Sequence, residues 1–311
     1  MFPRRRPLSP SVVELDGPFR HQLVHTRGIR LHAAVAGRPQ DPLVVLLHSA
    51  FGGWFEYRRV IAPLAARGFH VAAVDARGYG LSDKPPSTAG DDLRTAAGDI
   101  AGLIRALGHE QAIVVGADAG GTVAWALAAN YPDMVAGLVS VSAAHPVDLR
   151  RAIAARPWYH VRTMARPGLP LLGTAAYRRH LLASTAPEFR HSPECAEELH
   201  LRLQSARISN ARPGMLRTNR LLTASVSARW LHTTVAAPTL LLQPPLPMWR
   251  HLARRSLRRI SGDVAVRHVA RTRDLPHVEN PPAFVETVAE FADNADNADN
   301  ADNADNADNH A

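Results

Sequence analysis

The sequence predicts an α/β protein in which a mostly parallel, doubly wound sheet carries a helical cap inserted after the sixth core strand. Short apolar runs alternate with amphipathic segments over most of the 311 residues, as expected for βαβ units that cover both faces of a sheet. This alternation stops after Pro146 and resumes at Thr239. A hydrophobic content of 46% is sufficient for a large core.

The elements before the interruption follow in a regular order. We expect strands over residues 21–26, 30–36, 43–47, 71–74, 112–115 and 137–141, and helices over 54–66, 91–107 and 122–130. Gly28 marks the turn between the first two strands, and Gly108 ends the second helix. Residues 16–146 are therefore the first part of the core.

The interruption itself predicts helices. Residues 147–232 contain no strand pattern and are broken by prolines at positions 157, 167, 170 and 213, so we expect a helical cap. The core resumes over residues 233–291, with strands at 239–242 and 264–269, helices at 249–258 and 281–291, and a loop at 274–280. Such a cap would lie over the carboxyl edge of the sheet, where ligands bind in open α/β sheets.

Both ends of the chain are expected to be disordered. Residues 1–15 form an N-terminal arm with basic residues but no apolar stretch behind them, which is not a secretory signal. Residues 292–309 repeat the triplet Ala-Asp-Asn six times before His310 and Ala311. This period of three matches neither helix nor strand, and alanine methyl groups bury too little surface to offset the entropy of ordering. We assign this tail, 292–311, no function.

Composition limits the functional classes. A single cysteine, Cys195, forms no internal disulfide, and no apolar run reaches membrane-spanning length, so we expect a cytoplasmic protein. The net charge is +8, and residues 147–232 contain fourteen arginines against five carboxylates. An anionic partner or surface would suit this charge, but no nucleic-acid motif accompanies it, so we expect no nucleic-acid partner. The sequence leaves the oligomeric state open.

The segment most informative about function is Gly116-Ala-Asp-Ala-Gly-Gly121, which follows an apolar strand and opens a helix. This context predicts a nucleophile elbow, with Asp118 at the tip of a strained turn and glycines where helix and strand approach closely. An aspartate nucleophile attacks saturated carbon and leaves an alkyl ester on the enzyme. The alternative is a glycine-rich turn that contains an acid by chance.

Two further motifs accompany the elbow. His48-Ser49-Ala50 follows a buried strand, where an oxyanion loop would lie, and Leu275-Pro-His-Val-Glu-Asn-Pro-Pro282 precedes the last helix. The order of nucleophile, cap and late histidine resembles the α/β-hydrolase fold. The loop over 75–85, the segment over 141–146 and the opening over 16–21 are similar to its epoxide hydrolase branch. The resemblance covers residues 16–291.

The resemblance implies a reaction in two steps. Asp118 would open an epoxide to give a covalent ester, and His277 would activate the water that hydrolyses it. Backbone N–H groups of Ala50 and Ala119 would form the oxyanion hole. The substrate class is a small, apolar epoxide, and neither a cofactor nor a metal is expected. His48, Asp75 and Asp83 are expected to structure their loops.

The chain departs from the family pattern at several positions. Leu246 stands where a triad acid is expected, the other acid position falls near Ser142, and Asp148 is several residues further on. The family supplies the proton for ring opening from two cap tyrosines. Tyr159 is near the first of these positions, Tyr177 is a weaker candidate, and Asn219 stands at the second.

These departures leave two classes of function open. The first is an epoxide hydrolase, possessing Asp118, His277 and the elbow glycines, with activity reduced by the missing acid. The second is a catalytically inactive protein of the same fold that binds a small apolar ligand under its cap. A haloalkane dehalogenase fits less well, because Ala50 and Ala119 offer no side-chain donor to a halide, and ester hydrolysis would favour a serine nucleophile.

Overall fold

The computed structural model describes residues 6–86, 92–166, 168, 173–222 and 233–308. Its centre is a sheet of eight strands in the order β1-β2-β4-β3-β5-β6-β7-β8. The strands are β1 (Arg20–Thr26), β2 (Ile29–Ala36), β3 (Leu43–Leu47), β4 (His70–Val74), β5 (Ala112–Ala117), β6 (Val135–Val141), β7 (Thr239–Leu242) and β8 (Val264–Arg267). All eight predicted strands are present, and those at the centre of the sheet are buried apolar runs bounded by turn residues.

The sheet is mostly parallel, as predicted. Strand β2 pairs antiparallel with β1 and with β4, and all other neighbouring strands are parallel. Helices α2 (Leu93–Ala106) and α3 (Ala119–Asn130) contribute to the apolar core on one face. Helices α1 (Ile61–Ala65) and α11 (Pro281–Asp308) contribute to the core on the other. The carboxyl ends of the parallel strands thus remain as the edge at which polar residues gather.

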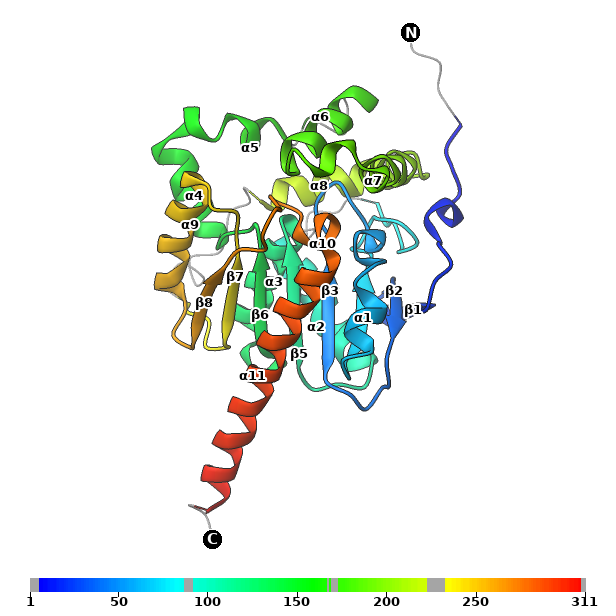
Figure 1. Ribbon diagram of the computed structural model, residues 1–311. Coiled ribbons are helices and arrows are strands. Elements are labelled where there is room, and N and C mark those ends of the chain that lie inside the picture. The colour runs from blue at the N-terminus through cyan, green and yellow to red at the C-terminus, as the bar shows by residue number, and fades with distance from the viewer. Residues whose placement is uncertain (1–5, 87–91, 167, 169–172, 223–232, 309–311) are drawn as a thin grey trace.

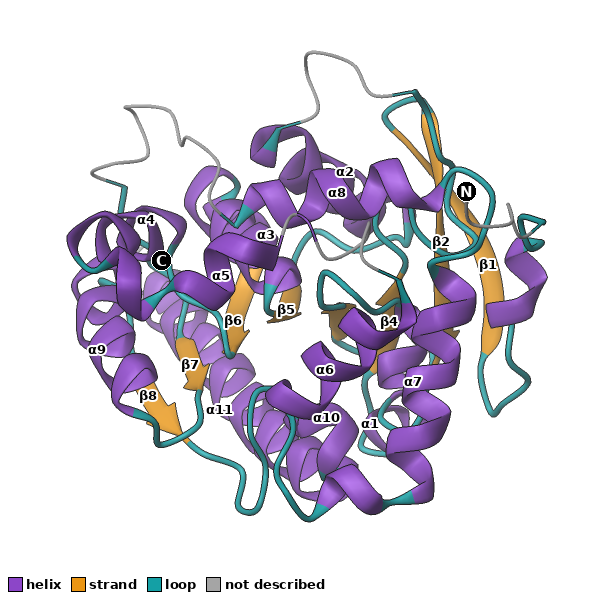
Figure 2. Ribbon diagram, turned by 90° about the horizontal axis from the view of Figure 1, so that it is seen from above, coloured by secondary structure: helices purple, strands orange, loops and turns teal. Residues whose placement is uncertain are grey.

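The insertion after β6 is helical. It contains α4 (Pro146–Ala155), η4 (Pro157–Tyr159), α5 (Val161–Ala165), α6 (Thr174–Ser184), η6 (Phe189–His191), α7 (Pro193–Ser205) and α8 (Ala211–Leu221). Figure 1 shows these helices above the sheet, and Figure 2 shows α5, α6, α7 and α8 from above. Within the described part of the cap there is no strand, as expected. Pro213 lies in the first turn of α8, where proline does not break a helix, and Pro167 and Pro170 lie outside the described residues.

The remaining helices are short or lie at the C-terminus. After β3 comes η2 (Trp54–Tyr57), and after β7 come α9 (Pro247–Ser256) and η8 (Leu257–Arg259). The single helix expected over 54–66 is therefore divided into η2 and α1. Pro63 explains this division, since its ring and missing N–H restrict it to the first turn of α1. One helical turn, α10 (Pro276–Glu279), forms in the loop expected over 274–280.

Both predictions of terminal disorder differ from the structure. Residues 10–13 form the 3₁₀ turn η1 (Pro10–Val13), and Leu8 bridges Ile208 of the cap. Val13 is fully buried and its carbonyl accepts a hydrogen bond from Trp54 Nε1, so tertiary contacts order this part of the arm. Residues 1–5 lie outside the described part.

At the other end, α11 continues through the Ala-Asp-Asn repeat to Asp308 instead of ending near Phe291 (Figure 1). The start of α11 is anchored by buried Phe284 and Val288. Extension of an existing helix needs no new nucleus, and alanine has the highest helix propensity. The described residues include no helix with the length and apolar character that crossing a membrane requires.

Candidate active site

The predicted elbow is a strained turn at the carboxyl end of β5. Asp118 joins β5 to α3 with φ 54° and ψ −112°, a backbone conformation that side chains other than glycine rarely adopt. A Cβ on Gly116 would lie 2.5 Å from the Gly120 carbonyl oxygen, and one on Gly120 would lie 2.4 Å from the Leu47 oxygen. Close backbone approach therefore explains these two glycines, and the turn presents the Asp118 carboxylate at the edge of the sheet.

The loop after β3 contacts this carboxylate directly. The Ala50 N–H donates to Asp118 Oδ2 at 3.1 Å, as an oxyanion-loop amide would. Ala119, the other predicted oxyanion residue, is the first residue of α3 and is fully buried. Tyr79 was not singled out in the sequence, yet its hydroxyl donates to the Ala50 carbonyl at 2.8 Å. Burial raises the pKa of Tyr79 well above its ordinary value, so this hydroxyl keeps its proton and holds the loop.

His48 has the structural role expected of it. Its Nδ1 lies 2.7 Å from the Ser49 carbonyl, and the Ala76 N–H donates to its Nε2 at 3.1 Å. The proton therefore belongs on Nδ1. Asp75 likewise accepts hydrogen bonds from the N–H groups of Trp54 and Leu81 and from His32. Asp83 pairs with Arg30, so both acids structure their loops.

An arginine of the cap, which no sequence motif indicates, contacts the Asp118 carboxylate. Arg166, directly after α5, donates from its two terminal nitrogens to Asp118 Oδ1 at 2.7 Å and to Oδ2 at 2.5 Å. Its guanidinium carbon lies 5.4 Å from the centroid of the Phe51 ring. Both side chains of the pair are largely buried, at 15% and 14% exposure. The surplus of arginine in the cap was visible in the sequence, but no motif distinguishes Arg166 from the other thirteen.

His277 lies in the single turn α10 and is completely buried. Its ring stacks on Tyr57 with centroids 4.6 Å apart and an interplanar angle of 23°. Glu279 shapes this segment, because its carboxylate accepts from the N–H groups of Arg273, Leu275 and Ala186. Among the described residues, neither ring nitrogen of His277 has a hydrogen-bond partner. The imidazole is thus held in place by packing and by the turn around it.

A carboxylate does lie beside His277, and it is one that the sequence analysis missed. Glu56 Oε2 is 3.6 Å from His277 Nε2, within ion-pair distance but longer than a hydrogen bond. Ser49 donates to Glu56 from both its N–H and its hydroxyl, at 2.8 and 2.6 Å. Burial opposes the charge, but Arg202 and His277 outweigh it and keep the pKa of Glu56 well below its ordinary value. Glu56 is therefore an anion.

Glu56 belongs to a buried ionic cluster that joins core and cap. Arg202 of α7 contacts Glu56 and also pairs with Glu198 at 2.9 Å, and Arg58 donates to Glu198 at 2.9 Å. The side chains of Arg202, Glu56 and Glu198 are at most 1% exposed. Because these side chains are buried, their charges depend on one another for compensation, so removal of one deprives its direct partner of a buried counterion.

The positions where an acid was sought do not supply one. Leu246 is the N-cap residue of α9, and Asp148 of α4 pairs with Arg259 at 3.4 Å. Ser142 follows β6 with φ 43°. The family pattern places the triad acid after the sixth or the seventh core strand. The carboxylate beside His277 instead comes from η2, after β3.

The two candidate tyrosines have different surroundings. Tyr159 in η4 is 51% exposed and its ring contacts His160, so it faces solvent. Tyr177 of α6 is buried, its hydroxyl donates to the Met215 sulfur at 3.3 Å, and its ring meets Phe51 edge-on at 5.7 Å. Burial raises the pKa of Tyr177 to about 12. Of these two candidates, Tyr177 is therefore the one that lies beside the oxyanion loop.

Two further polar residues lie near the site, the buried Asn219 and the half-buried Asp274. Asn219 of α8 donates to the Met215 carbonyl at 2.9 Å. Asp274 accepts from Trp249 Nε1 at 3.1 Å, and burial raises its pKa to about 6. The charge of Asp118 raises the pKa of Asp274 and that of Arg166 lowers it. Asp274 therefore interacts electrostatically with both members of that ion pair. Among the described residues no group of three His, Cys, Asp or Glu side chains could hold a metal ion.

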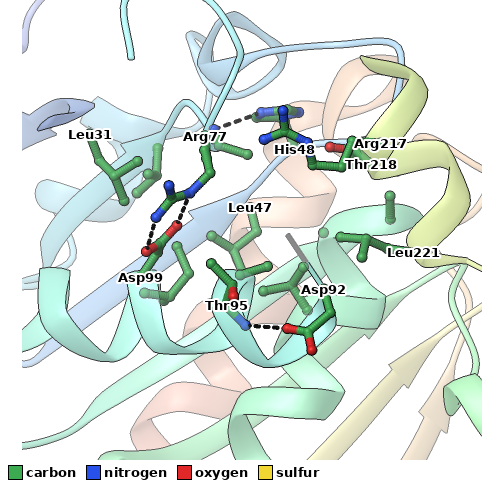
Figure 3. A pocket seen from close by; sticks show the side chains of 17 residues that line it. Leu31, Leu47, His48, Arg77, Asp92, Thr95, Asp99, Arg217, Thr218 and Leu221 are labelled. Atoms are coloured by element: carbon green, nitrogen blue, oxygen red, sulfur yellow. Dashed lines mark hydrogen bonds and ion pairs between the residues drawn. The ribbon is translucent and has the colours of Figure 1, made fainter. Parts of the chain in front are cut away.

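A small apolar cavity borders the first residues of α3 (Figure 3). It has a volume of about 60 Å³ and is bordered by Ala119 and Gly120 and by residues of α2, α8, β3 and β4. Arg77 and Asp99 form a bidentate ion pair in its wall, at 2.8 Å for both hydrogen bonds.

The sheet order, the capped carboxyl edge and the strained turn at Asp118 define the class, a hydrolase fold. The model of the alpha/beta hydrolase fold family matches residues 42–214, more than half of the chain. The chain belongs to the α/β-hydrolase fold family.

Curated relatives are similar over part of their length. The AB hydrolase superfamily protein YfhM of Bacillus subtilis is 39% identical over 168 residues, which are 53% of this chain and 58% of that protein. Epoxide hydrolase B of Mycobacterium tuberculosis is 42% identical over 124 residues, 39% of this chain and 35% of that protein. The matched parts thus span from about a third to three fifths of these relatives.

Solved structures match more of the chain. Epoxide Hydrolase A from Mycobacterium thermoresistibile has a TM-score of 0.71 at 24% identity, covering 88% of this chain and 98% of that one. Epoxide hydrolase VrEH1 from Vigna radiata has a TM-score of 0.72 at 23% identity, covering 89% and 98%. At this identity the likeness establishes the fold. The relatives of this chain by sequence and its neighbours by structure include epoxide hydrolases.

Proposed function

We propose that the protein hydrolyses an epoxide through an alkyl ester on Asp118. The observation that carries this proposal is the Ala50 N–H on Asp118 Oδ2 at 3.1 Å, beside a strained elbow. An amide in this position would stabilise the oxyanion of the second step. Because Oδ2 is held there, Oδ1 is the attacking oxygen.

In the first step Asp118 Oδ1 bonds to an epoxide carbon and the ring C–O bond breaks. The alkoxide takes a proton, for which Tyr177 is the proposed donor because it is buried beside Phe51. Tyr159, the other candidate, does not suit this role, since a half-exposed side chain is poorly placed to protonate a group held beneath the cap.

In the second step a water molecule gives a proton to His277 and its oxygen adds to the Asp118 carbonyl carbon. Ala50 and Ala119 hold the resulting oxyanion. Collapse of this intermediate breaks the bond between the Asp118 carbon and the oxygen that carries the substrate, and the leaving alkoxide takes the proton from His277 to give the diol. The carboxylic acid left on Asp118 then returns its proton to the Tyr177 phenolate, which restores the enzyme. Glu56 is the proposed positioning residue, because its negative charge beside Nε2 favours the imidazolium that forms.

Hydrolysis in ¹⁸O-water tests this scheme. A panel of styrene oxide, an aliphatic epoxide and 3-phenylglycidate should give diol from at least one member, and ¹⁸O should enter the Asp118 peptide over several turnovers, because water attacks the carboxyl carbon. Asp118→Asn should abolish diol formation, and His277→Gln should accumulate the ester as a mass adduct. Exposed Asp133→Asn and His25→Gln are the matched controls. Absence of both diol and adduct over the whole panel would contradict the proposal.

One observation favours a second function, a catalytically inactive protein that binds a ligand under its cap. Arg166 engages both oxygens of Asp118, which lowers the reactivity of the carboxylate. The same epoxide panel separates the two functions, since a binding protein would show ligand-dependent thermal stabilisation but no diol and no adduct.

A further inference from the structure

We infer that the substrate carries a carboxylate and that Arg166 binds it. This inference rests on the proposed function and changes its substrate class, since the sequence alone suggested an apolar epoxide. Three observations lead to it: the position of Arg166 on the attacking oxygen, the burial of its guanidinium, and the shape of the hydrogen bonds that it makes.

Arg166 stands on the path of attack. A reacting carbon must approach the nucleophilic oxygen to about 3–3.5 Å. The Ala50 N–H engages Oδ2, which leaves Oδ1 for attack, and an Arg166 nitrogen already lies 2.7 Å from Oδ1. An epoxide can therefore reach Asp118 only after the guanidinium has left at least this oxygen.

The displaced guanidinium needs a new counterion. Its side chain is only 15% exposed, and its Nε is buried with no hydrogen-bond partner among the described residues. A neutral epoxide would separate Arg166 from Asp118 and leave a buried cation unpaired, which strongly disfavours binding. A carboxylate on the substrate would replace the lost partner while the epoxide carbon occupies the space at Oδ1.

The hydrogen bonds indicate which anion fits. Arg166 meets the Asp118 carboxylate with two parallel N–H donors, the fork geometry that suits a planar carboxylate. The Phe51 ring, 5.4 Å from the guanidinium carbon, offers a surface that keeps the cation near the site after it has moved. Arg202, by contrast, is already engaged by Glu56 and Glu198.

The surrounding charge is compatible with an anion. The cap region, residues 147–232, has fourteen arginines and five carboxylates, which favours the approach of negative ligands. Besides Asp118 itself, Asp274 lies close enough to interact with Arg166, and burial raises the pKa of Asp274, so part of its charge is removed towards acidic pH.

A binding experiment tests the inference without turnover. In the Asp118→Asn variant Arg166 has lost its ionic partner, so 3-phenylpropanoate should bind at least tenfold more tightly than 3-phenylpropanamide in calorimetry. Adding Arg166→Gln should abolish this preference. Arg179→Gln, at an exposed arginine of α6, should leave it unchanged. Equal affinity of acid and amide, or a preference that survives Arg166→Gln, would overturn the inference.

Turnover supplies the second test. The wild-type protein should hydrolyse 3-phenylglycidate with a kcat/KM at least tenfold above that for 3-phenylglycidamide, and Arg166→Gln should remove most of this difference while circular dichroism stays unchanged. If Arg166→Gln instead accelerates the amide and the acid has no advantage, Arg166 is an inhibitory contact and the inference is wrong. Arg166-dependent carboxylate binding with no diol from any epoxide would refute the proposed function and retain the anion site.

Discussion

Glu56 Oε2 lies 3.6 Å from His277 Nε2, in a part of the molecule where neither side chain is exposed to solvent. The two residues come from opposite ends of the chain, η2 after β3 and α10 before α11. The carboxylate that accompanies His277 thus comes from neither of the positions at which sequence patterns place a triad acid. The proposed function makes this pair responsible for the second step, hydrolysis of the ester.

Replacing Glu56 should therefore slow the second step more than the first. Glu56→Gln removes the charge that favours the imidazolium, so we expect the ester on Asp118 to accumulate and kcat to fall by about 10²-fold or more. Intact-protein mass spectrometry during turnover measures the ester. The variant should also lose about 3–5 kcal/mol of unfolding free energy, because Arg202 loses a buried partner.

Glu198→Gln is the matched control for this prediction. Glu198 belongs to the same cluster and pairs with Arg202 and Arg58, and within the part of the chain that the structure describes it forms no hydrogen bond or ion pair with His277. It should destabilise the protein to a similar extent in urea denaturation without accumulation of the ester. Equal ester accumulation in both variants would show that Glu56 acts through stability alone.

The two cap tyrosines should differ in their effect on the first step. Tyr177→Phe removes the proposed proton donor beside Phe51, so the rate of ester formation should fall by about 10²-fold. Tyr159→Phe changes a half-exposed side chain and should leave this rate unchanged. Single-turnover mass measurements give both rates. Because the pKa of Tyr177 is about 12, activity should show no alkaline loss from this group below about pH 10; the reverse ranking of the two variants would exclude it as donor.

The elbow should not tolerate a methyl group at Gly116. A Cβ there would lie 2.5 Å from the Gly120 carbonyl oxygen, and neither backbone segment can move without disturbing β5 or α3. We expect Gly116→Ala to lower the free energy of unfolding by about 1–3 kcal/mol or more, measured by urea denaturation. Gly168→Ala, where nothing lies within 4 Å of the added carbon, should be neutral, and similar losses at both positions would argue against the close approach.

Asp274 should make stability depend on pH between about 4 and 6. Its pKa in the folded protein is about 6, above the ordinary value of 3.8. In this window the folded state holds more protons than the unfolded state, so the free energy of unfolding falls as pH rises. The fall is about 3 kcal/mol at most, from about 1.4 kcal/mol per pKa unit.

Asp274→Asn should remove this part of the pH dependence, so the variant should gain stability relative to wild type on going from pH 4 to pH 7. Chemical denaturation at several pH values measures the difference. Exposed Asp263→Asn should follow the wild type at every pH. A constant difference between Asp274→Asn and wild type would mean that Asp274 titrates normally.

Much of the fold was predictable because the signals are local. The apolar runs at 43–47 and 239–242 reproduce β3 and β7 residue for residue, since both strands are buried on two faces. The predictions of secondary structure differ from the structure where a single proline or a tertiary contact determines the local conformation. Pro63 divides the helix expected over 54–66, and burial of Val13 orders part of an arm that composition alone would leave disordered.

The site divides in the same way. The elbow at Asp118 and the loop at Ala50 were predictable, because the required backbone turns are encoded by adjacent glycines and strand ends. The contacts of Glu56 and Arg166 were not predictable, because each contacts a residue far away in the sequence. The residues next to a buried glutamate or a cap arginine do not indicate which distant residue it will contact.

By itself, then, the sequence determined that an aspartate stands at a strained turn beneath a helical cap, with a late histidine in α10. The tertiary structure alone decided which charges surround them: Glu56 beside His277 and Arg166 on Asp118. The physical reason is that backbone strain and strand burial depend on neighbouring residues, whereas the pairing of buried charges depends on which distant segments the fold brings together.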